Sequence, residues 1–201
     1  MNERARPLSK IVDYDRSPFG RDPAIVPLIS GDGARAYYRV GYLACAQDTA
    51  ADLRGRRGAN ASAMPVLFLF RHYVELALKD ILAAAGAFAI ELVDRKFGHD
   101  LDALWQEAGK VFDNFGCQPT EEHCSLITEL IELDGRADAF RYALDKRDQR
   151  QFERIGSVNL DTLVRAIDST STLFERLLDK MEETETEMDE MITEAIARDP
   201  Y

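Results

Sequence analysis

Cysteine is scarce in this chain, and its spacing excludes the sites that cysteines most often build. The 201 residues include three cysteines, Cys45, Cys117 and Cys124, and no C-x-x-C pair. An odd number without paired spacing argues against both a disulfide framework and a zinc site. His123 precedes Cys124, but neighbouring residues on a helix diverge by about 100°. We therefore expect structural roles for these residues, no metal site and no cofactor.

Long apolar runs are also missing. The longest, residues 81–90, is well short of the roughly 20 residues that a helix needs to span a bilayer. The N-terminus carries Arg4, Arg6 and Lys10, but it continues into acidic residues and prolines in place of the apolar core of a secretory signal. These features predict a cytoplasmic protein with no membrane partner.

Positive charge is scarce, since the formal net charge is −11, but the excess of acidic residues is distributed unevenly along the chain. Residues 181–201 hold eight acidic residues and one basic residue, so this segment carries −7 and the rest of the chain carries −4. Bulk acidity therefore describes mainly the C-terminal end and does not exclude a local basic site for nucleic acid. Within the acidic segment, Met188, Met191, Ile192 and Ile196 keep a sparse apolar stripe, which would pack on the N-terminal arm or on a second subunit.

What the chain has in quantity is helical periodicity. Apolar residues recur at spacings of three and four in segments that begin after capping residues. The pattern predicts an all-α bundle of about five principal helices, at 34–54, 64–85, 98–115, 120–134 and from 160 onward. For residues 136–158 the sequence predicts an ordered loop or short hairpin. The expected organisation is an irregular arm over 1–33, a helical domain over 34–180 and an acidic helical extension over 181–201.

The first predicted helix carries three tyrosines, Tyr37, Tyr38 and Tyr42. Such a row could stack the bases of a nucleic acid. It could equally belong to the core, with its hydroxyl groups at the rim. We favour the core interpretation, with Tyr38, Tyr42 and Cys45 along one side of the helix.

The stretch 64–85 is the most apolar long segment, and it predicts the helix on which the others pack. Arg71, Glu75 and Lys79 interrupt it at spacings of four, which places them on one face of a helix. Because a central helix rarely tolerates charges unless they pair, the sequence predicts a polar cluster inside or at the edge of the bundle.

Three motifs taken together resemble a known family. They are Phe70-Arg-His-Tyr-Val-Glu-Leu-Ala-Leu-Lys79, then Gly98-His-Asp-Leu101 with Leu104-Trp105, and then Phe140-Arg-Tyr142 before the last helix. Over residues 34–180 the chain resembles uncharacterised bacterial proteins of the HEPN-like type. The resemblance implies a helical bundle that forms a homodimer. Many such domains are RNases in toxin–antitoxin, CRISPR or anti-phage systems, so the resemblance also implies a role of this kind.

The sequence departs from this family at the catalytic motif. HEPN RNases carry an arginine followed by a histidine after four to six intervening residues, whereas the nearest match here, Arg95-Lys-Phe-Gly-His99, has three. In the family the histidine activates a ribose 2′-hydroxyl and the arginine steadies phosphate. The departure leaves open whether this chain is an enzyme, a metal-independent RNase, or a protein that only binds.

The charged residues allow two interpretations. In the first, Arg71, Lys79 and Arg141 hold phosphate, Glu75 orients them and His99 moves a proton. RNA would also contact Tyr142 and the glycine-rich loop that carries Arg54, Arg56 and Arg57. In the second, Glu75 simply pairs with Arg71 and Lys79, and His99 caps its helix and bonds a carboxylate or carbonyl. The protein would then be a non-catalytic module for dimerisation or for a protein partner, such as the product of a neighbouring gene.

Overall fold

The computed structural model describes residues 34–54, 63–94, 96–137, 139–141 and 157–198, and in these ranges it is helical with no strand. The elements are α1 (Ala34–Leu53), α2 (Ala63–Ala84), η3 (Ala85–Ala87), α3 (Leu101–Phe115), α4 (Glu121–Asp134), η4 (Ala139–Arg141) and α5 (Leu160–Arg198). The prediction of an all-α bundle with five principal helices is confirmed. The arm over 1–33 and most of the predicted loop over 136–158 lie outside the described residues.

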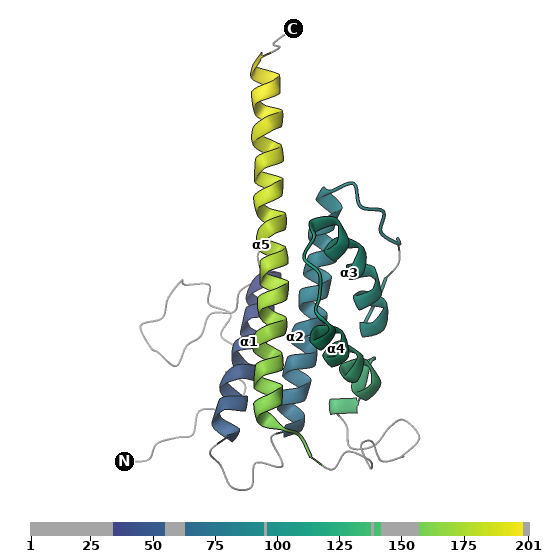
Figure 1. Cartoon of the computed structure of the whole chain (residues 1–201), viewed down its shortest axis with the longest axis vertical. Helices are drawn as coiled ribbons and strands as arrows, with labels where there is room; N and C mark the ends of the chain where they lie inside the picture. The colour runs from purple at the N-terminus through teal and green to yellow at the C-terminus, as the bar shows by residue number, and fades with distance from the viewer. Residues whose placement is uncertain (1–33, 55–62, 95, 138, 142–156, 199–201) are drawn as a thin grey trace, which may run out of the picture. The chain divides into compact units, whose positions relative to one another are not determined.

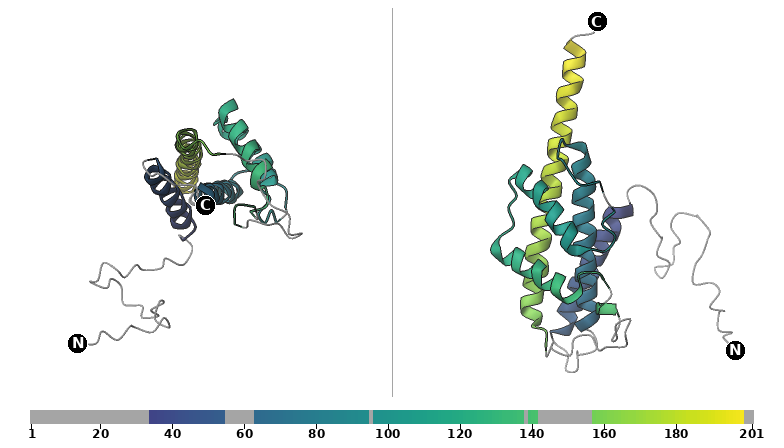
Figure 2. Two further views of the ribbon diagram at one scale, coloured as in Figure 1. Left: turned by 90° about the horizontal axis from the view of Figure 1, so that it is seen from below. Right: turned by 90° about the vertical axis from the view of Figure 1, so that its right-hand side faces the viewer.

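Helix α2 is the centre of the unit formed by Arg35–Tyr201. Its buried side chains include Phe70, Tyr73 and Leu78, none of which is exposed to solvent. These residues recur at helical spacing around more than one face, and α2 packs against α3, α5 and η4 (Figures 1 and 2). The prediction that the segment 64–85 forms the central helix is confirmed.

Local capping fixes where α3 and α4 begin. The Asp100 carboxylate accepts a hydrogen bond from the Ala103 amide at 3.1 Å, so Asp100 caps α3. The expectation that His99 caps this helix was therefore wrong, because the shorter Asp100 side chain holds the N-cap position. At α4, the Thr120 hydroxyl accepts from the His123 amide, and His123 Nδ1 accepts from the Thr120 amide at 3.1 Å. This capping box gives His123 the structural role that we expected.

Helix α1 presents a different face to the bundle from the one we expected. Its buried residues are Ala34, Arg39, Ala46, Ala50 and Leu53, whereas Tyr37 and Tyr38 are 61% and 57% exposed. The interpretation of the tyrosine row as core was therefore wrong for these two residues. The pattern misled because small alanines, which carry little hydrophobic signal, form the packed face, and because a buried arginine accompanies them.

Helix α5 leaves the bundle part-way along its length. Asn159 caps it, accepting from the Thr162 amide at 3.1 Å. Its buried positions end at Met181, and beyond that residue the helix continues to Arg198 with every residue exposed except the half-buried Thr184. The C-terminal part of α5 extends past the other helices of this unit (Figure 1).

Candidate functional site

A cluster of charged side chains gathers around the carboxylate of Glu75 on α2. Arg71 and Lys79 lie one turn before and one turn after it, and both donate to it, Lys79 Nζ at 2.6 Å from Oε1. His99, in the turn before α3, brings Nδ1 to 2.8 Å from the same oxygen. The structure thus brings together four of the five residues that we predicted as a site.

Arg71 is the most deeply buried member of the cluster. Its exposed fraction is 0%, although arginine is rarely buried in full. Besides Glu75, its guanidinium bonds three backbone carbonyls, those of Asp134 at 3.0 Å, His99 at 2.7 Å and Gly135 at 3.2 Å. Arg71 therefore ties α2 to the turn before α3 and to the end of α4, and it does not reach solvent.

Glu75 is held in the ionised state. Its side chain is 1% exposed, and burial by itself raises the pKa of a carboxyl group. The hydrogen bonds from Lys79 and Arg71, together with their positive charges, outweigh burial and lower the pKa of Glu75 to about 2. The cluster therefore keeps a buried negative charge at neutral pH, and this charge is in contact with His99 and Lys79.

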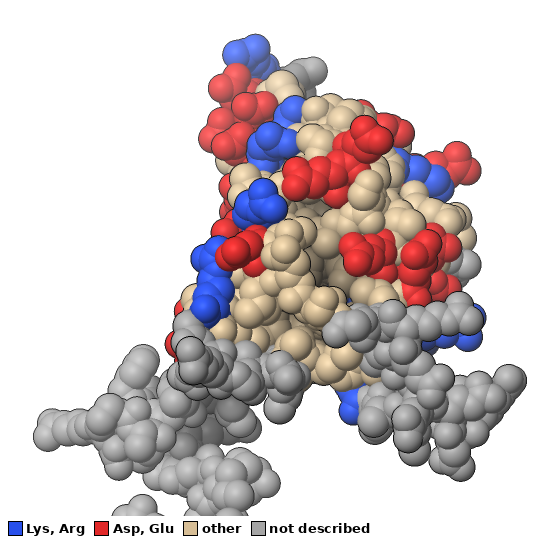
Figure 3. Space-filling model, turned by 60° about the horizontal axis from the view of Figure 1, so that its bottom comes forward, with Lys and Arg blue, Asp and Glu red and all other residues tan. Residues whose placement is uncertain are grey.

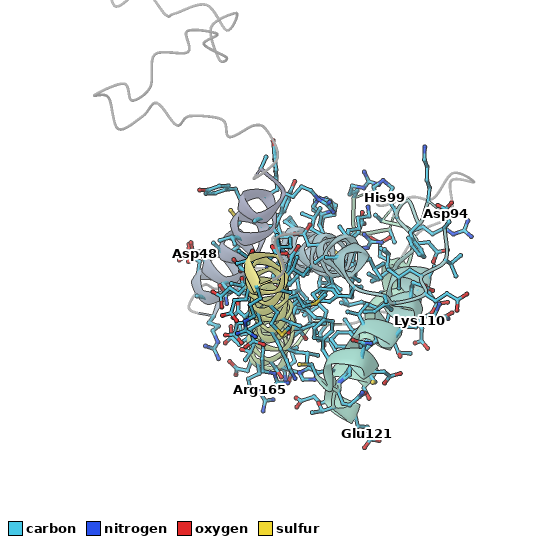
Figure 4. All side chains as sticks on the ribbon, turned by 90° about the horizontal axis from the view of Figure 1, so that it is seen from above. Asp48, Asp94, His99, Lys110, Glu121 and Arg165 are labelled. Atoms are coloured by element: carbon cyan, nitrogen blue, oxygen red, sulfur yellow. The ribbon has the colours of Figure 1, made fainter. Side chains whose placement is uncertain are left out.

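His99 is the most accessible member of the cluster. Its side chain is 61% exposed, against 31% for Lys79, and it lies at the edge of the bundle (Figure 4). An ionised carboxylate only accepts hydrogen bonds, so Nδ1 carries the proton that faces Glu75. In the neutral imidazole the lone pair then lies on Nε2, which is able to take up a proton from a bound molecule.

An aromatic group that the sequence analysis missed adjoins the cluster on α2. His72 stacks on Phe68 with ring centroids 5.7 Å apart, and Tyr42 from α1 meets His72 edge-on at 4.4 Å. Burial is the main cause that lowers the pKa of His72, which favours the neutral ring. The spacing of Phe68, His72 and Glu75, four and then three residues, was the available signal that they share a face.

Arg141, the fifth predicted residue, lies at the aromatic end of this face. Its guanidinium carbon is 5.9 Å from the centroid of the Phe68 ring, within reach of a cation–π interaction, and Nε donates to the Ala137 carbonyl. Phe68 and Glu75 are seven residues apart, which corresponds to about 10 Å along a helix. Arg141 therefore borders the same face without touching the Glu75 carboxylate.

A second ion network, also missed from the sequence, joins α1 to α2 and α5. Arg39 donates to Asp80 at 3.1 Å and also pairs with Glu175. Tyr73 lies beside Glu175, and burial, followed by that carboxylate, raises the pKa of its phenol. Arg39 is 8% exposed, so this network is largely shielded from solvent and has the structural role of holding α1 against α2 and α5.

Of the remaining predicted residues, Arg54 is described by the structure, and it is not part of the cluster. Arg54 pairs with Asp161 at the start of α5, with Nε 2.8 Å from the carboxylate. Arg56, Arg57 and Tyr142 lie outside the described residues. Two surface hollows, one along residues 171–183 of α5 and one lined by residues 89–93, Lys110 and Asn114, do not include the cluster.

The described ranges contain neither a candidate metal site nor a candidate membrane span. Among these residues, no group of three or more His, Cys, Asp or Glu side chains is placed to hold a metal ion. Within the same ranges, no helix has both the length and the apolarity to cross a lipid bilayer. Comparison of the chain with protein-family models, with curated proteins and with solved structures finds no match.

Proposed function

We propose that this protein binds RNA, and that a phosphate of the strand sits at the outer edge of the Glu75 cluster. The observation that supports this is the shared carboxylate oxygen: Lys79 Nζ and His99 Nδ1 both lie within 2.8 Å of Glu75 Oε1, and both side chains reach solvent. Arg71 and Lys79 together outweigh the single charge of Glu75. The site therefore offers positive charge to an anion while the rest of the chain stays acidic.

The residues of the cluster have different roles in this proposal. Arg71 is buried and supports the site, so the phosphate contact falls to Lys79, with His99 beside it and Arg141 bordering the strand further along α2. Acidic and basic side chains are interspersed over the described part of the face drawn in Figure 3. Binding of RNA therefore rests on local contacts rather than on a broad basic surface.

Binding is tested by fluorescence anisotropy with a labelled single-stranded RNA over a series of salt concentrations. Lys79→Ala and Arg141→Ala should each weaken binding and lower the slope of log K against log salt by about 0.7, the value for one phosphate contact on a single strand. The matched control is Arg198→Ala, which removes one positive charge at the far end of α5 and should change neither quantity. Absence of salt-sensitive RNA binding would remove the proposal.

Cleavage is a separate question, because His99 is the member of the cluster that is placed to transfer a proton. If the protein cleaves RNA, His99 Nε2 takes the proton of the ribose 2′-hydroxyl as its oxygen attacks the adjacent phosphorus. The bond from phosphorus to the 5′-oxygen then breaks, the departing 5′-oxygen takes a proton from water, and a 2′,3′-cyclic phosphate is left. His99→Ala should then abolish cleavage on a denaturing gel in the presence of a chelator and leave RNA affinity within about twofold. Cleavage that survives in His99→Ala would exclude this role.

The second candidate function is a protein-interaction module, and one observation favours it. Four large apolar side chains, Met188, Met191, Ile192 and Ile196, are exposed on the part of α5 that leaves the bundle. Contiguous exposed apolar surface commonly marks an interaction site.

A further inference from the structure

The C-terminal part of α5, residues 182–198, is an exposed helix with one apolar side. Met188, Met191, Ile192 and Ile196 are 38%, 63%, 54% and 68% exposed. Successive residues advance by about 100° around a helix, so these four fall within one arc of about 140°. We refer to them as the apolar stripe.

The apolar stripe continues the buried side of the same helix. Phe174, Leu177 and Met181 face the core with exposures of 0%, 0% and 1%, and at helical spacing Met188 lies two turns beyond Met181 on the same side. After one turn that carries Thr184 and Glu185 on this side, the helix resumes its core-facing pattern beyond the end of the bundle. A pattern of this kind is typical of a helix that completes its packing with another helix.

The flanks and back of this segment are acidic. The described part holds seven carboxylates and one basic residue, Arg198, which pairs with Glu194. Six of them, Glu182, Glu183, Glu187, Asp189, Glu190 and Glu194, lie on the flanks and back, and Glu185 lies on the side of the stripe about one turn before Met188. The segment also contains the C-terminal end of α5, where the helix dipole is negative. Both contributions attract a cation and repel an anion.

We infer that residues 182–198 form a docking site for a basic amphipathic helix of a partner protein. Apolar side chains of the partner would cover the apolar stripe, and its lysines and arginines would meet the flanking carboxylates. Two methionines in the stripe suit such a site, because a flexible thioether side chain adapts to its neighbour. The seventeen residues span about 26 Å as a helix, which is enough for four to five turns of a partner.

A second copy of this chain is a poorer occupant on electrostatic grounds. It would bring an identical set of carboxylates against the first, and like charges brought together in an interface cost free energy. A basic partner removes this repulsion and gains from the same charges. The proposed site is distinct from the Glu75 cluster and does not depend on RNA binding.

The test uses the full chain and a designed helical peptide of about 18 residues, with leucines at spacings of three and four and lysines elsewhere. Fluorescence anisotropy should show binding that weakens with salt. A peptide of the same composition in scrambled order, without an apolar side, should bind at least about tenfold more weakly. Equal binding of the two peptides would reduce the site to non-specific attraction and overturn the proposal.

Matched variants locate the site. Met191→Gln with Ile196→Gln should weaken binding of the amphipathic peptide about tenfold or more, and Glu187→Gln with Glu194→Gln should weaken it and flatten its salt dependence. Thr186→Gln, about 150° around the helix from the middle of the stripe, and Lys79→Ala, in the Glu75 cluster, should leave it unchanged. Circular dichroism checks that each variant remains folded.

Sedimentation velocity of the full chain decides between the occupants. A monomer is expected at neutral pH and low salt, where the carboxylates repel. A dimer that Met191→Gln with Ile196→Gln dissociates would show that a second copy covers the stripe, and it would overturn the assignment to a basic partner. Failure of the stripe variants to alter peptide binding would overturn it as well.

Discussion

At the scale of single residues, the Arg71 and Glu75 pair has the strongest consequences for stability. Neither side chain reaches solvent to any extent, with exposures of 0% and 1%. Removal of one member of a buried ion pair leaves the other charge without compensation in a medium that solvates it poorly. The two residues are thus interdependent.

We expect Glu75→Ala to lower the free energy of unfolding by about 3 kcal/mol, because it leaves Arg71 buried without a counter-charge. Glu75→Gln keeps a hydrogen-bond acceptor and should cost less. Urea denaturation of both variants measures this difference. Glu182→Ala, which removes an exposed carboxylate from α5, serves as the control and should stay within about 0.5 kcal/mol of the parent. An equally small change for Glu75→Ala would contradict the buried pairing.

The same carboxylate gives a pH dependence whose sign follows from its pKa. Folding lowers the pKa of Glu75 from 4.5 to about 2, so the unfolded chain binds more protons between these values and stability rises with pH there. The contribution of Glu75 is complete above pH 4.5 and disappears as the pH falls through about 2. The stability gap between the parent and Glu75→Gln should therefore narrow on acidification. A gap that stays constant in denaturation curves across this range would argue against the lowered pKa.

At the scale of the elements, α1 depends on a few polar contacts for its attachment. Arg35 and Arg39 both pair with Asp80, but the Arg35 side chain is 59% exposed and the Arg39 side chain 9%. Exposed ion pairs contribute little, since water and salt screen them. Arg39 also reaches Glu175 on α5, so it fastens α1 to two helices at once.

We expect Arg39→Ala to destabilise the protein by about 2 kcal/mol, since it removes charged hydrogen bonds from a buried site. Arg35→Ala, which breaks a pair with the same aspartate, should cost less than about 1 kcal/mol. Hydrogen exchange should show faster opening of α1 in Arg39→Ala than in Arg35→Ala. Similar effects of the two substitutions would mean that burial of Arg39 contributes nothing.

The elements also show how far the sequence alone could lead. The helices were predictable because each carries its own periodic pattern, and because α3, α4 and α5 follow a capping residue, such as Asn159 for α5. Likewise, Arg71, Glu75 and Lys79 are four residues apart, so helix geometry alone places them together. The contact of Arg39 with Glu175 was not predictable, because the two residues are 136 positions apart and no local pattern links them. The same reason hid the ring contact between Tyr42 and His72.

At the scale of the whole molecule, α5 has two parts with different environments. Up to Met181 it contributes buried residues to the bundle, and after that it contributes exposed side chains and most of the negative charge. The folding free energy of the bundle therefore depends little on the last part of the chain. Stability and net charge are separable in this protein.

A chain that lacks residues 184–201 should have a free energy of unfolding within about 1 kcal/mol of that of the full chain, because none of the described residues that it removes is buried. A longer deletion, of residues 177–201, also removes Leu177 and Met181, which are 0% and 1% exposed, and should destabilise by several kcal/mol. Thermal melts of the two deletion variants provide the comparison. A large loss in the shorter deletion would show that the exposed part of α5 supports the fold.

The contacts of Arg71 have a consequence for how this sequence tolerates change. Three of its acceptors are main-chain carbonyls, those of Asp134, His99 and Gly135, and a carbonyl is present whatever side chain its residue carries. A substitution at His99 that preserves the backbone leaves its carbonyl in place as an acceptor. Positions 134 and 135 are constrained for other reasons, because the Asp134 carboxylate accepts from the Ala139 and Phe140 amides and a Cβ at Gly135 would lie 2.9 Å from the Ile131 carbonyl oxygen. Position 71 admits no substitute with the same fork of donors, so diverged sequences with this architecture are best sought by an arginine and a glutamate four residues apart in an apolar helix.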